Sequence, residues 1–262
     1  MEFNSLKHLP ERIFDNLQNL KILDMHYNQL KNISEKIFNG LVNLRELNLS
    51  INKISNILEN TFNELVNLET LDLSSNKSLK LPNTIFNNLQ NLKFLELSMI
   101  ELKFIPEQIF DNLISLEELK LYCNRLECLP EKIFDKLINL KKLQLDNNRL
   151  KYLPEQIFDK LINLQELHMC YNYLKRIPKE IFDNLSNLIN LRLSNNLLKF
   201  FPEKIFDNLL KLTKLDLANN KFEIIQEEIF NNLPKLKVLD LSSNPFKIPP
   251  KDFRDDIFLI FH

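Results

Sequence analysis

A spacing of 24 residues runs through almost the whole sequence and limits the possible folds more than any other feature. Phenylalanine recurs at this interval without an insertion or a deletion, at Phe14, Phe38, Phe62, Phe86, Phe110, Phe134, Phe158, Phe182, Phe206 and Phe230. Two leucine ladders keep the same step, one through Leu20 and Leu44 and one three residues behind it. A fixed period of roughly 20–29 residues predicts stacked repeats rather than a compact globule.

The first half of each repeat predicts a short strand. In residues 140–148, LKKLQLDNN, Leu143 and Leu145 alternate with Gln144 and Asp146. This period of two places leucines toward the core and polar side chains toward solvent. Asn148 follows, and an amide there has the donor and the acceptor that the backbone needs where the chain leaves the strand.

The second half of each repeat predicts the outer wall of a coil. In residues 149–163, RLKYLPEQIFDKLIN, Pro154 suits the first position of a short helical turn. Ile157, Phe158 and Leu161 are expected to point back toward the core. One repeat cannot bury these side chains alone, whereas stacked repeats share one continuous core.

The pattern LxxLxLxxNxLxxLPxxIFxxLxN resembles the 24-residue "typical" class of leucine-rich repeat proteins. That class includes Toll-like receptor ectodomains, the variable lymphocyte receptors of jawless fish and small leucine-rich proteoglycans. The resemblance implies an α/β solenoid: a curved, right-handed coil with a parallel β-sheet on its concave side and loops or short helical turns on its convex side. The cysteine-rich caps of the extracellular members have no counterpart in this sequence.

We expect one leucine-rich-repeat domain over residues 1–262. Residues 1–19 match the second half of a repeat, residues 20–235 hold nine 24-residue repeats, and residues 236–262 form the last repeat with a possible C-terminal cap. The apolar tail around Phe258 is either a partial cap or part of a longer solenoid. Two irregularities lie close together: Leu79 is displaced by one residue beside Ser78, and Ile100 replaces the ladder asparagine.

Composition excludes several functional classes. Gly40 is the only glycine, so Gly-rich phosphate loops are absent. The formal net charge of −1 argues against nucleic acid as a partner. The first residues contain no secretion signal, and no apolar run is long enough to span a membrane. The compartment is therefore extracellular if the chain is a fragment of a larger ectodomain, and cytoplasmic if the chain is complete as written.

The three cysteines do not form a disulfide framework. Cys123 and Cys170 lie two repeats apart, about 10 Å at a strand spacing of ~4.8 Å, which is beyond disulfide reach. Cys123 and Cys128 flank one turn and could approach each other. Buried thiols are the favoured interpretation of all three.

Alternation along the strands predicts four outward positions per repeat on the concave face. These columns contain nine acidic and four basic residues, so this face is more acidic than the whole chain. Aromatic and Arg side chains supply most anchors in protein interfaces. We therefore expect a protein ligand to bind the central repeats, through Phe94, Glu96, Met99, Lys120, Tyr122, Gln144, Asp146, His168, Tyr171 and Arg192.

Catalysis has little support in the sequence. His168 and Cys170 project from one face with Asp146 on the next strand, which suggests a metal site or a Cys–His nucleophile. Neither arrangement has a complete ligand set or an oxyanion donor, so we expect no enzyme activity, cofactor or metal.

The expected function is non-catalytic recognition of a protein ligand on the concave face. The resemblance implies a fragment of a receptor-type, immune or adhesion ectodomain. The alternative is an intracellular scaffold or adaptor, and the least favoured interpretation is an accessory domain of an enzyme. The sequence predicts neither the ligand nor the oligomeric state.

Overall fold

The computed structural model describes residues 5–248 and 253–261. The remaining positions, which include the first four residues of the predicted partial repeat and part of the predicted cap, lie outside the described residues. The chain divides into two compact units. Unit 1 comprises residues 1–125 and 136–140, and unit 2 comprises residues 126–135 and 141–262. The prediction of a single domain stays a prediction.

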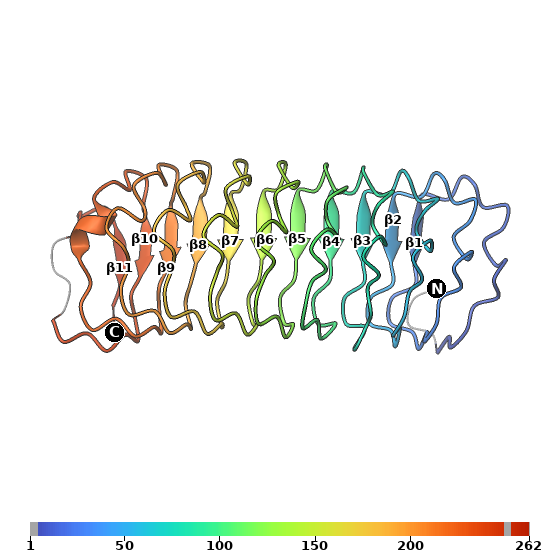
Figure 1. Ribbon diagram of the computed structural model, residues 1–262, viewed down its shortest axis with the longest axis horizontal. Helices are drawn as coiled ribbons and strands as arrows, with labels where there is room; N and C mark the ends of the chain where they lie inside the picture. The colour runs from blue at the N-terminus through green and yellow to red at the C-terminus, as the bar shows by residue number, and fades with distance from the viewer. Residues whose placement is uncertain (1–4, 249–252, 262) are drawn as a thin grey trace. The chain divides into compact units, whose positions relative to one another are not determined.

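Unit 1 contains five parallel strands among its described residues, each three residues long. They are β1 (Ile22–Asp24), β2 (Glu46–Asn48), β3 (Thr70–Asp72), β4 (Phe94–Glu96) and β5 (Glu118–Lys120). Each strand pairs with the next in chain order, and the register follows the 24-residue step, as in Leu23 opposite Leu47 (Figure 1). The pleat therefore places every central leucine in one buried row.

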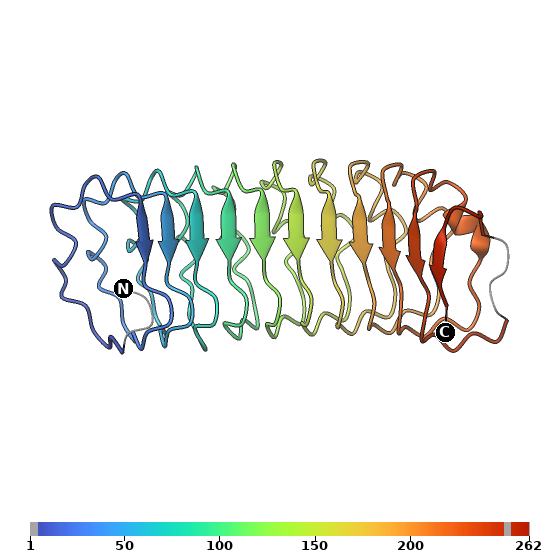
Figure 2. The same cartoon turned by 180° about the vertical axis from the view of Figure 1, so that it is seen from behind.

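Unit 2 contains six parallel strands in its described part. They are β6 (Lys142–Gln144), β7 (Glu166–His168), β8 (Asn190–Arg192), β9 (Lys214–Asp216), β10 (Val238–Asp240) and β11 (Phe258–Ile260). The first five keep the 24-residue step, whereas Phe258 pairs with Val238 after only 20 residues. The apolar tail thus adds a strand to the end of the sheet in unit 2 (Figure 2). Arg254 fixes this end by donating to the carbonyl oxygens of Leu233 (3.0 Å) and Leu236 (3.1 Å).

The parallel strands with few helices confirm the predicted solenoid fold. The segments opposite the strands are successive turns, closed by bonds such as that from the Ile37 N–H to the Ser34 carbonyl oxygen (3.2 Å). Among the described residues, η1 (Glu227–Phe230) is the one 3-10 helix. It occurs where Gln226 replaces the proline found in most repeats.

The ladder asparagines support the backbone as predicted. Asn172 shows the pattern: its Nδ2 donates to the carbonyl oxygens of Leu145 (3.0 Å) and Met169 (3.2 Å), and its Oδ1 accepts from the Leu150 N–H (3.0 Å). One buried amide therefore joins the turns of two consecutive repeats and leaves few backbone groups unsatisfied. Equivalent bonds are made by Asn52, Asn76, Asn124, Asn196 and Asn220.

The two sequence irregularities in unit 1 are one structural defect. The N–H groups of Leu30 and Ile54 donate to ladder asparagines, but the N–H group of Ser78 would face Ile100, which has no side-chain oxygen. Ser78 instead adopts a φ of 63°, and Leu79 fills the core position with 4% of its surface exposed. Loss of the acceptor and displacement of the leucine are therefore coupled.

The phenylalanine ladder forms the outer part of the core in each unit. Phe38 and Phe62 stack in unit 1 with ring centroids 6.0 Å apart, and Phe182 and Phe206 stack at 6.3 Å in unit 2. These rings are at most 1% exposed. Burial and offset stacking explain why the period admits no insertion, since a shifted repeat would lose both.

Candidate recognition surface

The first and third residues of each strand point to the open face of the sheet. In β6, Lys142 and Gln144 are partly exposed, while Leu143 between them is fully buried. Figure 2 views the strands from this open side. The period-two pattern alone is enough to predict this placement.

The other two predicted outward positions do not lie in strands, because each strand is only three residues long. The Asp216 carboxylate accepts a bond from the Ala218 N–H (3.1 Å), and Asn48 accepts one from the Ser50 N–H (3.0 Å). Such Asx turns bend the chain immediately after the strand. The third position is buried in four repeats, at Ser50, Ser98, Cys170 and Ser194.

The fourth position forms a turn at the rim of the sheet, with a left-handed backbone in every repeat. Its φ values lie between 48° and 61° at Tyr27, Ile51, Ser75, Met99, Cys123, Asn147, Tyr171, Asn195, Asn219 and Ser243. Asparagine tolerates this region, whereas a β-branched residue such as Ile51 is strained there. The prediction that these residues lie on the strands is therefore wrong.

In unit 1, Lys120 on β5 lies among Phe94, Glu96 and Glu118. Its ammonium lies 4.6 Å from the centroid of the Phe94 ring, and it pairs with Glu96 (3.3 Å) and Glu118 (3.5 Å). Met99 and Tyr122 follow at the rim and in the turn, with Met99 48% exposed and Tyr122 half-buried. Part of the predicted site is thus a compact cation–aromatic cluster.

Burial raises the pKa of two acidic groups in this cluster. Glu96 is only 4% exposed, and burial raises the pKa of its carboxyl, while Ser98 and the Lys120 ammonium oppose the shift. The Oε1 atom of Glu96 makes no hydrogen bond within the described residues. Burial, followed by the Glu96 charge, also raises the pKa of Tyr122. The predicted exposure of Glu96 is therefore wrong, and its carboxylate pairs with Lys120 of the next strand.

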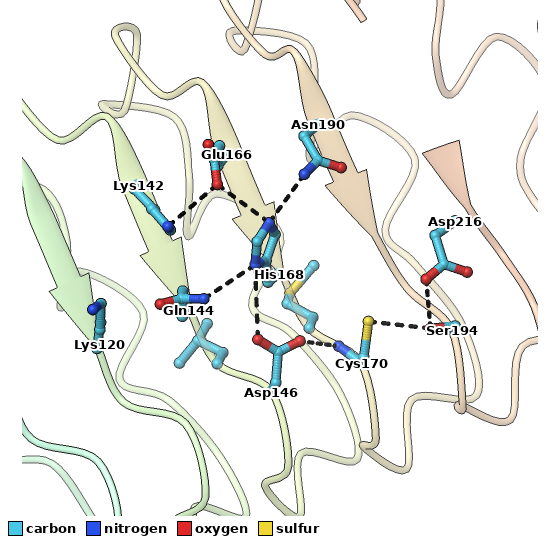
Figure 3. A network of polar contacts seen from close by, with 12 residues as sticks. Lys120, Lys142, Gln144, Asp146, Glu166, His168, Cys170, Asn190, Ser194 and Asp216 are labelled. Atoms are coloured by element: carbon cyan, nitrogen blue, oxygen red, sulfur yellow. Dashed lines mark hydrogen bonds and ion pairs between the residues drawn. The ribbon is translucent and has the colours of Figure 1, made fainter. Parts of the chain in front are cut away.

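In unit 2, a network of polar contacts spreads over β6 to β9 and the turns that follow them (Figure 3). His168 lies at its centre. Its Nδ1 contacts Gln144 Nε2 (3.2 Å) and lies 4.0 Å from Asp146 Oδ2. Its Nε2 contacts Asn190 Nδ2 (3.3 Å) and lies 3.5 Å from Glu166 Oε2, which also pairs with Lys142 at 3.5 Å.

The network continues through the turns after the strands. Asp146 Oδ1 accepts from the Cys170 backbone N–H (2.8 Å). The Ser194 hydroxyl lies 3.2 Å from Cys170 Sγ and 2.7 Å from Asp216 Oδ2. Neighbouring repeats are thus joined by side chains as well as by the backbone ladder, which fixes the positions of these polar groups.

The protonation states in this network do not fit a Cys–His nucleophile. Burial raises the pKa of the Cys170 thiol to about 12, so the thiol stays protonated at neutral pH. Burial also lowers the pKa of His168, although the Asp146 charge opposes the shift. Since His168 is 7% exposed, its predicted role as an exposed contact residue is also corrected.

The remaining predicted site residues of unit 2 are accessible. Arg192 is exposed at the end of β8, and Tyr171 at the rim is 57% exposed. Gln144 and Asp146 are partly exposed and belong to the His168 network. Their participation in binding stays a prediction.

A family model described as leucine rich repeat matches residues 1–54, 28–77, 66–126, 114–174, 162–222 and 211–255. The chain is a leucine-rich repeat protein. The search of curated protein sequences gives no match. Among solved structures, a leucine-rich repeat protein of Leptospira interrogans is 38% identical, with a TM-score of 0.80 over 88% of this chain and 57% of that chain.

Two further structural neighbours come from complexes of several proteins. A chain in the octameric complex of Latrophilin 3, Unc5D and FLRT2 is 27% identical, with a TM-score of 0.76 over 92% of this chain and 72% of that one. A chain of the Drosophila Toll–Spätzle complex shares the fold at 24% identity, with a TM-score of 0.73 over 91% of this chain and 38% of that one. The present chain thus spans little more than half of the Leptospira protein.

The described part of this leucine-rich repeat chain has no group of three or more His, Cys, Asp or Glu side chains placed to hold a metal ion. No helix among the described residues is long and apolar enough to cross a membrane. The three cysteines remain thiols, with Cys170 buried and Cys123 and Cys128 partly exposed. The prediction that all three are buried is therefore correct only for Cys170.

One surface was not predicted from the sequence. It lies along the edge of unit 2 that follows the sheet and includes the exposed rings of Tyr152, Tyr173 and Phe200. Its signal in the sequence is a Lys or Arg within two residues of an aromatic residue in each of the segments 147–153, 171–177, 195–201 and 219–225, which the strand columns do not include.

Proposed function

We propose that this chain is a non-catalytic recognition module that binds a protein ligand on the open face of its sheet. The observation that carries the proposal is the His168 network of unit 2. It holds charged and amide groups from several strands in fixed positions on an otherwise open sheet. A surface whose side chains are already ordered loses less conformational entropy on binding.

Two accessible side chains next to this network are suited to anchor a ligand. Arg192 is exposed and carries a planar guanidinium that can bind a carboxylate through two hydrogen bonds. Tyr171 presents a half-exposed ring at the rim. Arg and Tyr are enriched among the residues that dominate binding energy in protein interfaces.

Unit 1 offers an anchor of similar chemistry. Lys120 lies over the Phe94 ring and is held by two carboxylates, so its ammonium keeps a defined position. Met99 adds an adaptable apolar contact at the rim. We propose that Phe94, Met99, Lys120 and Tyr122 contribute to ligand binding.

The comparisons support recognition rather than catalysis. The structural neighbours include chains from the Toll–Spätzle complex and from the complex of Latrophilin 3, Unc5D and FLRT2, and the leucine-rich repeat fold is a scaffold that hosts many binding functions. The protonated thiol of Cys170 removes the most plausible nucleophile of this face. A receptor-type or adhesion role is accordingly our preferred form of the proposal.

Site-specific photo-crosslinking tests the proposed face. p-Benzoylphenylalanine replaces Tyr171 on the sheet side in one variant and Ile162 on the outer segments in a matched variant. These side chains are 57% and 53% exposed, so the two probes are equally accessible. Irradiation in extracts of the source organism should yield a discrete protein adduct from position 171 only. Equal yields from both positions, or an adduct from position 162 alone, would refute the proposed face.

A further inference from the structure

The net charge of the chain is near zero, but acidic and basic residues of unit 2 are concentrated in different segments. The segments 147–153, 171–177, 195–201 and 219–225, which leave the sheet after each strand, contain six basic residues and the single acid Glu223. By contrast, the outer segments 154–165, 178–189, 202–213 and 226–237 contain eight acidic and six basic residues. The edge of unit 2 is therefore basic, although the chain as a whole is not.

We define the basic strip as Arg149, Lys151, Lys175, Arg176, Lys199 and Lys221. The backbone keeps these segments side by side: the Tyr173 N–H donates to the Leu150 carbonyl oxygen (2.9 Å), and the Lys221 N–H donates to that of Leu198 (2.8 Å). Leu150 and Leu198 are fully buried, while all six strip residues are exposed. Lys151, Lys175 and Lys199 thus form one row that advances by one repeat at a time, and the other three cations lie in the same segments.

Most of these cations have no acidic partner among the described residues. Lys151 pairs with Glu127 at 2.8 Å. The acid within the edge segments, Glu223, pairs with Lys247. The other five members of the strip make no ion pair in the described part of the chain. An uncompensated row of like charges attracts a linear polyanion.

Exposed aromatic rings occur in the same segments as the cations, with Tyr152 after Lys151 and Phe200 after Lys199. Tyr152, Tyr173 and Phe200 are 53%, 51% and 63% exposed. None of them stacks on another ring or on a cation within the described residues. Flat rings beside cations are the arrangement that holds unpaired bases and the phosphates between them.

The strip ends at a pocket of about 590 Å³. Phe200, Ile224 and Ile229 form its apolar wall, and Lys199 and Lys221 lie at its margin. The acids Glu203 and Glu223 also line it, but Glu223 is neutralised by Lys247. This volume is ample for one nucleobase placed between apolar side chains, with its phosphate near the lysines.

We propose that the basic strip of unit 2 binds single-stranded nucleic acid, with phosphates on Lys175, Arg176 and Lys199 and bases on Tyr173 and Phe200. The net charge and the acidic sheet face disfavour nucleic acid on the sheet, whereas this edge of unit 2 is basic. Regularly spaced cations match a regularly charged polymer better than an acidic protein. The rings favour unpaired bases over a duplex or a sulfated glycan.

Fluorescence anisotropy with labelled oligo(dT) and oligo(U) 12-mers tests the proposal. For wild type, phosphate contacts with the five strip cations that make no ion pair among the described residues predict a log–log salt slope of about −3.5, hence about 100-fold weaker binding at 200 mM than at 50 mM salt. The variant Lys175→Glu/Arg176→Glu/Lys199→Glu should reduce the magnitude of the slope by about 2. Its affinity should then fall only about sevenfold between 50 mM and 200 mM salt. The control Lys132→Glu/Lys160→Glu/Lys235→Glu changes the net charge equally on exposed outer segments and should keep the wild-type slope.

A second pair of variants tests the rings. Tyr173→Ala/Phe200→Ala should weaken oligonucleotide binding at least about tenfold, because each stacked base contributes about 1–3 kcal/mol. Ile162→Ala/Leu210→Ala removes equally exposed apolar side chains elsewhere and should have no effect. All the substituted strip residues are exposed, so the variants should keep the wild-type circular dichroism spectrum.

Three results would overturn the proposal. The first is that no 12-mer binds at 50 mM salt. The second is that the strip variant and its control bind equally. The third is that the bases have no role. This would be shown by full affinity of the ring variant, or by tighter binding of a sulfated oligosaccharide or a duplex than of the single strand.

Discussion

Ile51 provides a direct test of how the rim turn of each repeat is made. It is the β-branched member of a column in which every residue is left-handed, with a φ of 52°. This conformation costs about 1–2 kcal/mol for an ordinary L-residue, and asparagine bears it more easily. Ile51→Asn should therefore relieve strain, while loss of the half-buried isoleucine contacts costs about 1 kcal/mol.

Comparison with Ile22→Asn isolates the backbone contribution. Ile22 is 58% exposed and Ile51 is 45% exposed, so the same change removes similar contacts at both positions. Ile22 lies in β1 with an ordinary φ, so its replacement relieves no backbone strain. The free energies of unfolding of the two variants, measured by urea denaturation and circular dichroism, should differ by about 1–2 kcal/mol in favour of Ile51→Asn. Equal values, or a more stable Ile22→Asn variant, would refute the reasoning.

Three further predictions concern buried polar groups of unit 2. Asn172→Ala should lower the free energy of unfolding by about 2–5 kcal/mol, because several buried backbone groups lose their partner. Asn187→Ala removes two exposed hydrogen bonds and should cost under about 1 kcal/mol. Because its thiol pKa is raised to about 12, Cys170 should resist iodoacetamide at pH 8 in the native protein, while the other two cysteines react. Intact mass measures the labelling, and equal labelling of all three cysteines would contradict the burial of Cys170. Because the pKa of His168 is lowered in the folded state, the unfolded state binds more protons below pH 6.5, and the free energy of unfolding should fall as the pH drops from 6.5 toward the folded pKa. His168→Asn should reduce this fall. An unchanged pH profile of stability in the variant would count against the assigned pKa.

Much of the fold follows from the sequence because every repeat states the same pattern. The alternation around Leu143 predicts the strand, and the donor and acceptor of an amide predict the role of Asn148 and its equivalents. The coupling of Ser78 and Leu79 to Ile100 could not be read in the same way. It depends on which N–H group faces which side chain one repeat later, and that geometry appears only in the structure.

The candidate site was less predictable, since alternation states which side a residue faces but not where a strand ends. Every strand of the repeats ends after three residues, the third position is buried in four repeats, and the fourth position forms the rim in a left-handed conformation. Glu96 and His168 are almost fully buried beside Lys120 and Gln144, which are contacts between neighbouring repeats that alternation does not predict. Arg192 and Tyr171 remain accessible as predicted.

The affinity of the protein captured through position 171 is the most direct test of the proposed recognition face. Isothermal titration calorimetry would compare wild type, Tyr171→Ala/Arg192→Ala, and the control Ile162→Ala/Lys160→Ala on the outer segments. The account predicts at least about tenfold weaker binding for the sheet-side variant, since such anchors exceed about 1 kcal/mol each, and no change for the control. Wild-type affinity in the sheet-side variant, or a loss confined to the control, would contradict recognition through the open face of the sheet.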